Sequence, residues 1–146
     1  MTGYSHILLA VDFSDSALAV GQRACQIRKL YNARLSLIHV VEFVQLDLSN
    51  ELLMPQELEL DLELQENARR RLHEYAERLG IENCDCHIAQ GSTRREILNA
   101  AEQNKADLIV VGSHGRHGIQ LLLGSTANAV LHGAPCDVLA VRVKGA

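Results

Sequence analysis

Hydrophobic residues occur in five short runs, separated by longer stretches in which they recur every three or four positions. The runs span residues 7–11, 34–41, 84–90, 107–111 and 137–143. Short apolar runs bounded by turn residues are typical of buried strands, and three- and four-residue spacing is typical of amphipathic helices. The pattern therefore predicts five strands that alternate with four helices.

The first helix is expected over about residues 15–31, with Ser14 as its N-cap. Its expected inward stripe consists of Leu18, Cys25 and Leu30, with Ala17, Ala24 and Ile27 beside it. A third helix is expected over about residues 93–104, because the sequence from Thr93 to Glu96 has the form of a capping box. A fourth helix should follow Gly124.

The second helix has a proline near its start and a glycine after its end. Pro55 suits the first helical position, and Gly80 suits the C′ position. Its expected apolar face consists of Leu64, Ala68, Leu72, Tyr75, Ala76 and Leu79. Residues 57–64 alternate Glu or Asp with Leu, which by pattern alone is a strand, but Glu and Leu are good helix formers. We expect a helix there, with leucines on two faces that either widen the buried face or meet a partner.

Strand, helix and strand in regular alternation predict parallel strands joined by right-handed crossovers. The expected fold class is therefore α/β: an open, doubly wound, five-stranded parallel sheet of order 3-2-1-4-5 with helices on both faces. Such sheets bind ligands at the carboxyl ends of their strands, where the strand order reverses. That crevice lies between the first and fourth strands and brings Val11 and Asp12 close to Val111 and Gly112.

Composition narrows the class of protein. A chain of 146 residues, 47% hydrophobic and with two prolines, fits a single domain over residues 1–146. The net charge of −4 argues against a broad nucleic-acid surface. No apolar run approaches the roughly 18 residues of a membrane helix, and the first residues have no basic region before a short apolar run. We expect a cytoplasmic protein with no membrane or nucleic-acid partner.

The loop after the fourth predicted strand has the composition of a phosphate-binding site. Gly112 and Gly115 leave room for a phosphate to approach backbone N–H groups, and His114 and Arg116 add donors and positive charge. Gly124, Ser125 and Thr126 then open a helix, whose N-terminus favours anions. The alternative is that these glycines serve only tight turns. The P-loop and dinucleotide-binding motifs are both absent from the sequence.

Two of the four cysteines are separated by one residue. Cys84 and Cys86 lie on the same face of a predicted strand, a spacing that suits either a soft metal or ordinary core packing. The usual zinc motif has at least two residues between its cysteines.

Four segments together resemble the universal stress protein family over essentially the whole chain. They are residues 9–14 (Leu-Ala-Val-Asp-Phe-Ser), 39–41 (His-Val-Val), 112–115 (Gly-Ser-His-Gly) and 124–125 (Gly-Ser). In the ATP-binding branch of that family the motif is G-x₂-G, nine residues, then G-[S/T]. This chain has eight residues between Gly115 and Gly124.

The resemblance implies an adenine nucleotide alpha-hydrolase-like fold that binds ATP, or a related adenine nucleotide, with Mg or Mn. It implies that the Val40 and Val41 backbone meets the adenine edge, that Ala10 and Val11 line the ribose and base, and that Val111 closes the pocket. Asp12 either holds the metal ion or caps the following turn.

The expected function is that of a small stress-response regulatory protein with slow or no hydrolysis, at most a weak ATPase and not primarily an enzyme. The alternative is a dimeric interaction protein of the same family that binds no nucleotide. The resemblance implies a homodimer, or a higher oligomer, paired through the last strand from Val138 to Val143. An exposed, strongly β-forming edge favours such pairing.

Overall fold

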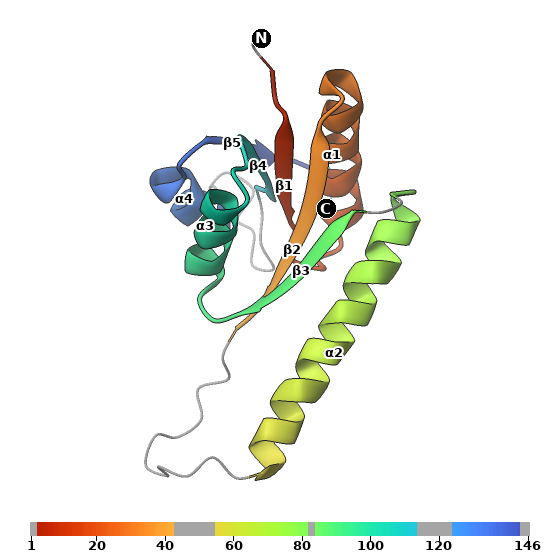
Figure 1. Ribbon diagram of the computed structural model, residues 1–146, viewed down its shortest axis with the longest axis vertical. Helices are drawn as coiled ribbons and strands as arrows, with labels where there is room; N and C mark the ends of the chain where they lie inside the picture. Colours follow the sequence, from red (N-terminus) through yellow and green to blue (C-terminus); the bar gives the residue numbers. More distant parts are fainter. Residues whose placement is uncertain (1–2, 43–54, 82–83, 114–123, 144–146) are drawn as a thin grey trace.

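The computed structural model describes residues 3–42, 55–81, 84–113 and 124–143, with side chains omitted for 55–61. Strands and helices alternate along the chain, as predicted (Figure 1). The strands are β1 (His6–Ala10), β2 (Arg34–Val41), β3 (Asp85–Gln90), β4 (Leu108–Gly112) and β5 (Asp137–Val141). The helices are α1 (Ala17–Tyr31), α2 (Pro55–Arg78), α3 (Thr93–Gln103) and α4 (Ser125–Gly133).

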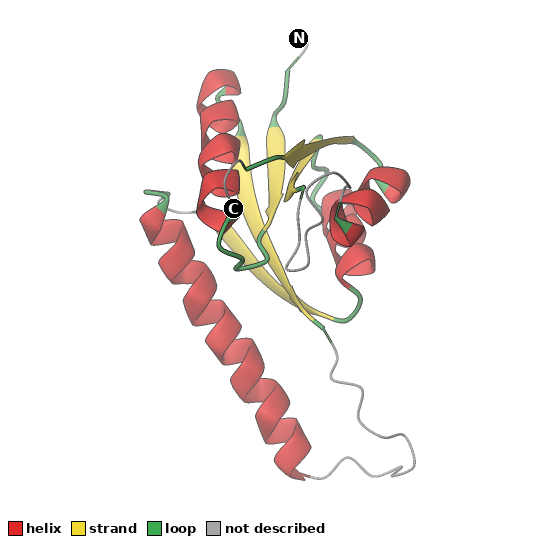
Figure 2. Ribbon diagram, turned by 180° about the vertical axis from the view of Figure 1, so that it is seen from behind, coloured by secondary structure: helices red, strands yellow, loops and turns green. Residues whose placement is uncertain are grey.

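The five strands form one parallel sheet of order β3-β2-β1-β4-β5. Helices α1 and α2 cover one face of this sheet, and α3 and α4 cover the other (Figure 2). The predicted fold class and strand order are therefore confirmed. The order reverses between β1 and β4, so a crevice opens beyond their carboxyl ends.

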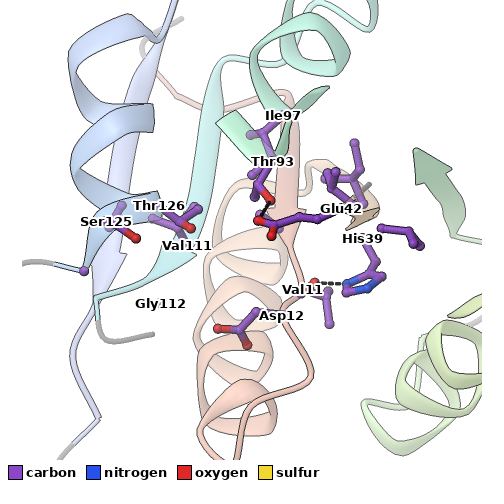
Figure 3. A pocket seen from close by; sticks show the side chains of 16 residues that line it. Val11, Asp12, His39, Glu42, Thr93, Ile97, Val111, Gly112, Ser125 and Thr126 are labelled. Atoms are coloured by element: carbon purple, nitrogen blue, oxygen red, sulfur yellow. Dashed lines mark hydrogen bonds between the residues drawn. The ribbon is translucent and has the colours of Figure 1, made fainter. Parts of the chain in front are cut away.

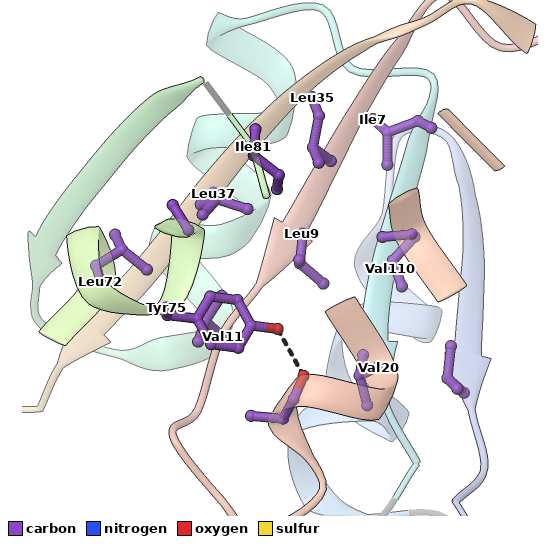
Figure 4. Packing of buried hydrophobic residues seen from close by; sticks show 14 of the residues in the cluster. Ile7, Leu9, Val11, Val20, Leu35, Leu37, Leu72, Tyr75, Ile81 and Val110 are labelled. Atoms are coloured by element: carbon purple, nitrogen blue, oxygen red, sulfur yellow. Dashed lines mark hydrogen bonds between the residues drawn. The ribbon is translucent and has the colours of Figure 1, made fainter. Parts of the chain in front are cut away.

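Alternate residues of the central strands pack into two separate cores. In β1, Leu9 faces α1 and α2, whereas Leu8 faces α3 and α4, and both are fully buried. Figure 4 shows the first core, where the buried Tyr75 hydroxyl donates a hydrogen bond to the Ala17 carbonyl at 2.5 Å. This bond ties α2 to the start of α1. The two cores fix the central strands and hence the positions of the loops that follow them.

The start of α1 differs from the prediction, and so does one residue of its predicted face. Ala17 and Ala24 are buried, and Leu18, Cys25 and Ile27 pack against the core as expected, but Leu30 does not. The N-cap of α1 is Ser16, not Ser14, and no side chain caps the helix. The Ser14 and Ser16 hydroxyls instead lie 3.1 Å apart, within hydrogen-bond distance of each other. Leu30 is 77% exposed, because α1 buries its small residues against the sheet. The buried residues of α1 are Ala17, Val20, Gly21 and Ala24.

Helix α2 is continuous through residues 57–64, so the helical interpretation of the alternating segment is correct. Gly80 follows it with a φ of +71°, the left-handed conformation expected at C′. Leu62 is 65% exposed, so at least one of the leucines is not part of a buried face. Helix α3 begins at Thr93 as predicted, but its cap is Ser92, which accepts a hydrogen bond from the Arg95 N–H.

Strand β5 lies at one edge of the sheet and β3 at the other. β5 ends at Val141, two residues before the predicted end. Within the described part of the chain, no helix has the length and hydropathy needed to cross a membrane.

Candidate functional site

A cavity of about 520 Å³ opens at the carboxyl edge of the sheet, where the strand order reverses (Figure 3). Its volume falls within the range of about 300–1,000 Å³ typical of small-molecule sites. It is lined by the ends of three strands and the first turns of two helices. The lining residues are Ala10, Val11, Asp12, Ile38, His39, Val40, Val41, Glu42, Thr93, Ile97, Val111, Gly112, Gly124, Ser125, Thr126 and Ala127.

Buried apolar side chains form part of the cavity wall. Val40 from β2, Val111 from β4 and Ile97 from α3 belong to the core between the sheet and α3 and α4. Val111 and Ile97 are each only 2% exposed. Because these side chains are held by the core, this wall is rigid and shaped before a ligand arrives. It suits a flat apolar group such as an aromatic base.

The turn after β1 brings a carboxylate to the cavity. Asp12 is exposed, and its Oδ1 accepts a hydrogen bond from the Ser14 N–H at 3.0 Å. Phe13 between them has a φ of +57°, a conformation that is uncommon for residues other than glycine. The turn is therefore tightly specified, and the capping role proposed for Asp12 is present in the structure.

His39 of the neighbouring strand β2 stabilises the same turn. His39 Nδ1 lies 2.6 Å from the Val11 carbonyl oxygen, and because a carbonyl only accepts, Nδ1 carries the proton. The Phe13 ring packs on the His39 ring with centroids 4.3 Å apart, and the Arg71 guanidinium from α2 lies 4.3 Å from the Phe13 centroid. The turn that carries Asp12 is thus fixed to both β2 and α2.

Sequence reasoning missed two polar residues that line the cavity, Thr93 and Glu42. The Thr93 hydroxyl donates a hydrogen bond to Glu42 Oε1 at 2.8 Å, and this bond links the start of α3 to the end of β2. Glu42 directly follows an apolar strand, which is a position where ligand-binding residues gather in parallel sheets. Its position directly after the strand was therefore the feature of the sequence that could have identified Glu42 as a cavity residue. Thr93 was assigned to the helix cap, a role that Ser92 fills.

The fourth strand and the helix after it contribute small and polar residues to the cavity. Gly124 is the N-cap of α4, and its N–H donates to the Ser113 carbonyl at 2.6 Å. Ser125 and Thr126 are exposed in the first turn of the helix, where backbone N–H groups lack helical partners. The Ser113 hydroxyl is buried with no hydrogen-bond partner among the described residues. Polar groups therefore gather between β4 and α4.

The charge of the described wall is negative. Its acidic residues are Asp12 and Glu42, and no lysine or arginine appears among the described lining residues. Favourable charge for an anion comes instead from the N-termini of α3 and α4, both of which reach the cavity.

The structure brings together every predicted site residue that it describes. These are Ala10, Val11, Asp12, Val40, Val41, Val111, Gly112, Gly124, Ser125 and Thr126. The other three predicted residues, His114, Gly115 and Arg116, lie outside the described residues.

Comparison with known proteins agrees with this architecture. The profile of the universal stress protein family matches residues 3–142. Universal stress protein A homolog 2 of Coxiella burnetii is 43% identical over 148 aligned positions, which cover 99% of each chain.

Solved structures give the same result. The universal stress protein UspA of Lactobacillus plantarum has a TM-score of 0.75 and 28% identity, with 97% of this chain and all of that one covered. A universal stress protein solved in complex with cAMP has a TM-score of 0.64 and 27% identity, with 96% and 98% covered. The chain therefore belongs to the universal stress protein family.

Proposed function

We propose that this protein binds ATP, or a related adenine nucleotide, in the cavity between the ends of β1 and β4. The observation that carries the proposal is the lining of the cavity, which combines buried apolar side chains with the N-termini of two helices. A nucleotide combines a flat base with an anionic tail, and these two kinds of lining suit the two parts. A family member at 27% identity was solved with cAMP, also an adenine nucleotide, which supports the assignment.

The base is best placed against β2. Val40 is buried and Val41 half-buried, and the chain at Glu42 leaves the sheet. The Val41 carbonyl already accepts a hydrogen bond from the Gly91 N–H, so the base edge would pair with the other backbone groups at this strand end. Ala10 and Val11 would then line the ribose, and Val111 would close the pocket from β4. The phosphates would lie toward Gly112, Ser125 and Thr126, with His114, Gly115 and Arg116 completing the phosphate site.

A magnesium or manganese ion fits the donors at the cavity. Asp12 uses Oδ1 for the turn and is exposed, so Oδ2 remains a hard oxygen donor directed by a fixed backbone. When bound, the ion would neutralise phosphate charge and screen it from Asp12 and Glu42. We propose that the protein retains the nucleotide as a regulatory ligand and that hydrolysis is slow or absent.

A second candidate function is a dimeric interaction protein that holds no nucleotide. The specific observation that favours it is the eight-residue spacing between Gly115 and Gly124, one short of the motif in the ATP-binding branch. In that case β5, which lies at the sheet edge, would pair with a second copy. The two candidates share the homodimer and differ only in nucleotide binding.

Denaturing the purified protein and chromatographing any released nucleotide tests the first candidate. Titration of ATP with magnesium into the stripped protein then gives the affinity, which we expect to be micromolar. The variants are Gly115→Val, on the phosphate loop, and, as a control outside the cavity, Gly3→Ala, where the added Cβ requires only the exposed Tyr31 ring to shift. Loss of binding in Gly115→Val alone, with the circular dichroism spectrum unchanged, supports the proposal. No released nucleotide and no binding at millimolar ATP would favour the second candidate.

Sedimentation velocity tests the homodimer separately. Removal of residues 142–146, just after β5, should weaken a dimer paired through this edge while the domain stays folded. A wild-type monomer at micromolar concentration would overturn the dimer without affecting the nucleotide proposal.

A further inference from the structure

Two thiols face each other at the end of the sheet opposite to the cavity. The sulfurs of Cys84 and Cys86 lie 3.6 Å apart, and both residues are free cysteines. Cys86 pairs with Leu37 near the start of β3, whereas Gln90 at the other end pairs with Val41 beside the cavity. The thiol pair is therefore separate from the nucleotide site and has no part in the proposed nucleotide binding.

The distance between the sulfurs matches the geometry of a shared metal ion. Two thiolates bound to one tetrahedral ion such as zinc, each at about 2.3 Å, lie about 3.8 Å apart. A disulfide requires the sulfurs to lie about 2.05 Å apart, much closer than the 3.6 Å observed. The observed separation is therefore closer to that of two sulfurs that share an ion than to that of a disulfide.

The two thiols are partly shielded from solvent by their surroundings. Cys84 and Cys86 are half-buried and pack against the core under α1 and α2, as does Cys25 of α1. Burial, followed by the hydrogen bond with Cys84, raises the pKa of the Cys86 thiol to about 12. The Cys86 thiol is therefore a poor nucleophile at neutral pH, and a metal ion must displace its proton. β3 is an edge strand, which leaves the pair reachable from one side.

We propose that Cys84 and Cys86 form a two-thiolate site for one soft metal ion. Thiolates select soft or borderline ions such as Cu⁺, Zn²⁺ and Cd²⁺ over Mg²⁺. Binding breaks two S–H bonds, forms two metal–sulfur bonds and releases two protons, with no change of oxidation state. The described residues contain no group of three or more metal-binding side chains, so solvent or a small ligand completes the coordination.

The test is titration of Cd²⁺ into the full-length protein in the presence of a phosphine reductant. We expect one ion per chain at micromolar affinity, a thiolate-to-metal absorption band, and two protons released per ion. Cys84→Ser and Cys86→Ser should each lose at least about 30-fold in affinity. Cys136→Ser, which removes a half-buried thiol elsewhere, should bind as the wild type does. Cys86→Ala keeps a small apolar side chain in the core and should show the same loss.

Three results would overturn the site. The first is Cd²⁺ binding weaker than millimolar in the reduced wild type. The second is equal affinity in wild type and Cys86→Ala, with both folded by circular dichroism. The third is equal loss in Cys25→Ser and Cys86→Ser, which would place the ion between α1 and β3 instead of on the β3 pair.

Discussion

Asp12 and Ser14 are joined by a 3.0 Å hydrogen bond from the Ser14 N–H to Asp12 Oδ1. The bond fixes the carboxylate at the mouth of the cavity and leaves its second oxygen for a ligand. The two roles considered for Asp12, turn formation and metal binding, are therefore compatible.

Replacing Asp12 separates these roles. Asp12→Asn keeps an oxygen that accepts from Ser14 but removes the negative charge. We expect the free energy of unfolding to change by less than about 0.5 kcal/mol. ATP affinity in the presence of magnesium should fall about tenfold, a loss of about 1.4 kcal/mol. Calorimetry with magnesium and with a chelator measures the effect, and Asp12→Ala, which also loses the turn bond, is the control. Unchanged magnesium dependence in Asp12→Asn would show that Asp12 is only a turn residue.

A negative charge at Ser125 should have opposite effects on stability and on binding. Ser125 is exposed in the first turn of α4, so Ser125→Glu complements the helix dipole and should stabilise the domain by about 0.3–1 kcal/mol. The same carboxylate would occupy the proposed phosphate site and repel ATP. Urea denaturation and ATP titration measure the two effects, with Ser125→Gln as the neutral control of similar size. Wild-type ATP affinity in Ser125→Glu would place the phosphates elsewhere.

The fold and the cavity differ in how much of each is predictable from sequence. Apolar runs and glycine signals define strands and crossovers locally, so β2 and the strand order agree with the prediction. The buried face of a helix is harder to predict from sequence, because burial depends on the element that packs against the helix. Leu30 is at the right spacing but is 77% exposed, whereas Val20 and Gly21, which the predicted stripe did not include, are buried.

The residues of the cavity are likewise predictable only in part, because some of them meet only in the folded structure. Residues in recognisable motifs, such as Gly112 and Ser125, could be predicted because a phosphate requires small residues and free N–H groups. Glu42 and Thr93 belong to no such motif, and they meet only because the end of β2 and the start of α3 are adjacent in space. Pairings of this kind depend on tertiary structure, and their residues lie 51 positions apart.

The hydrogen bond from Tyr75 to the Ala17 carbonyl should contribute measurably to stability. Tyr75→Phe leaves that carbonyl without the bond and should cost about 1–2 kcal/mol at pH 7. Burial raises the pKa of the Tyr75 phenol above its ordinary value. The folded state thus favours the protonated form, so this contribution is complete below about pH 10 and is lost as pH rises further. Urea denaturation of both proteins from pH 7 to 11 should show their difference shrinking. A difference that grows with pH would contradict this.

Asp107 should contribute stability with the opposite pH dependence. Partial burial raises its pKa, but hydrogen bonds from the Ser5 and His6 N–H groups and the Ser5 hydroxyl outweigh burial and leave the pKa below its usual value. The folded state favours the ionised form, so the contribution is complete above about pH 4 and is lost as pH falls through the folded pKa. Asp107→Asn should cost about 1 kcal/mol at pH 7 and little at pH 2. Denaturation at both values checks this, and an equal cost would exclude an electrostatic origin.

The binding of an adenine nucleotide at the β1 and β4 ends is tested most directly by ¹H–¹⁵N correlation spectroscopy during titration of ATP and magnesium into the stripped protein. We predict saturable shifts of the backbone amides of Val41, Gly112 and Ser125. Amides near Cys86, at the far end of β3, should not move. Absence of shifts at millimolar ATP, or shifts confined to the α2 side around Arg71, would contradict the assignment of this cavity.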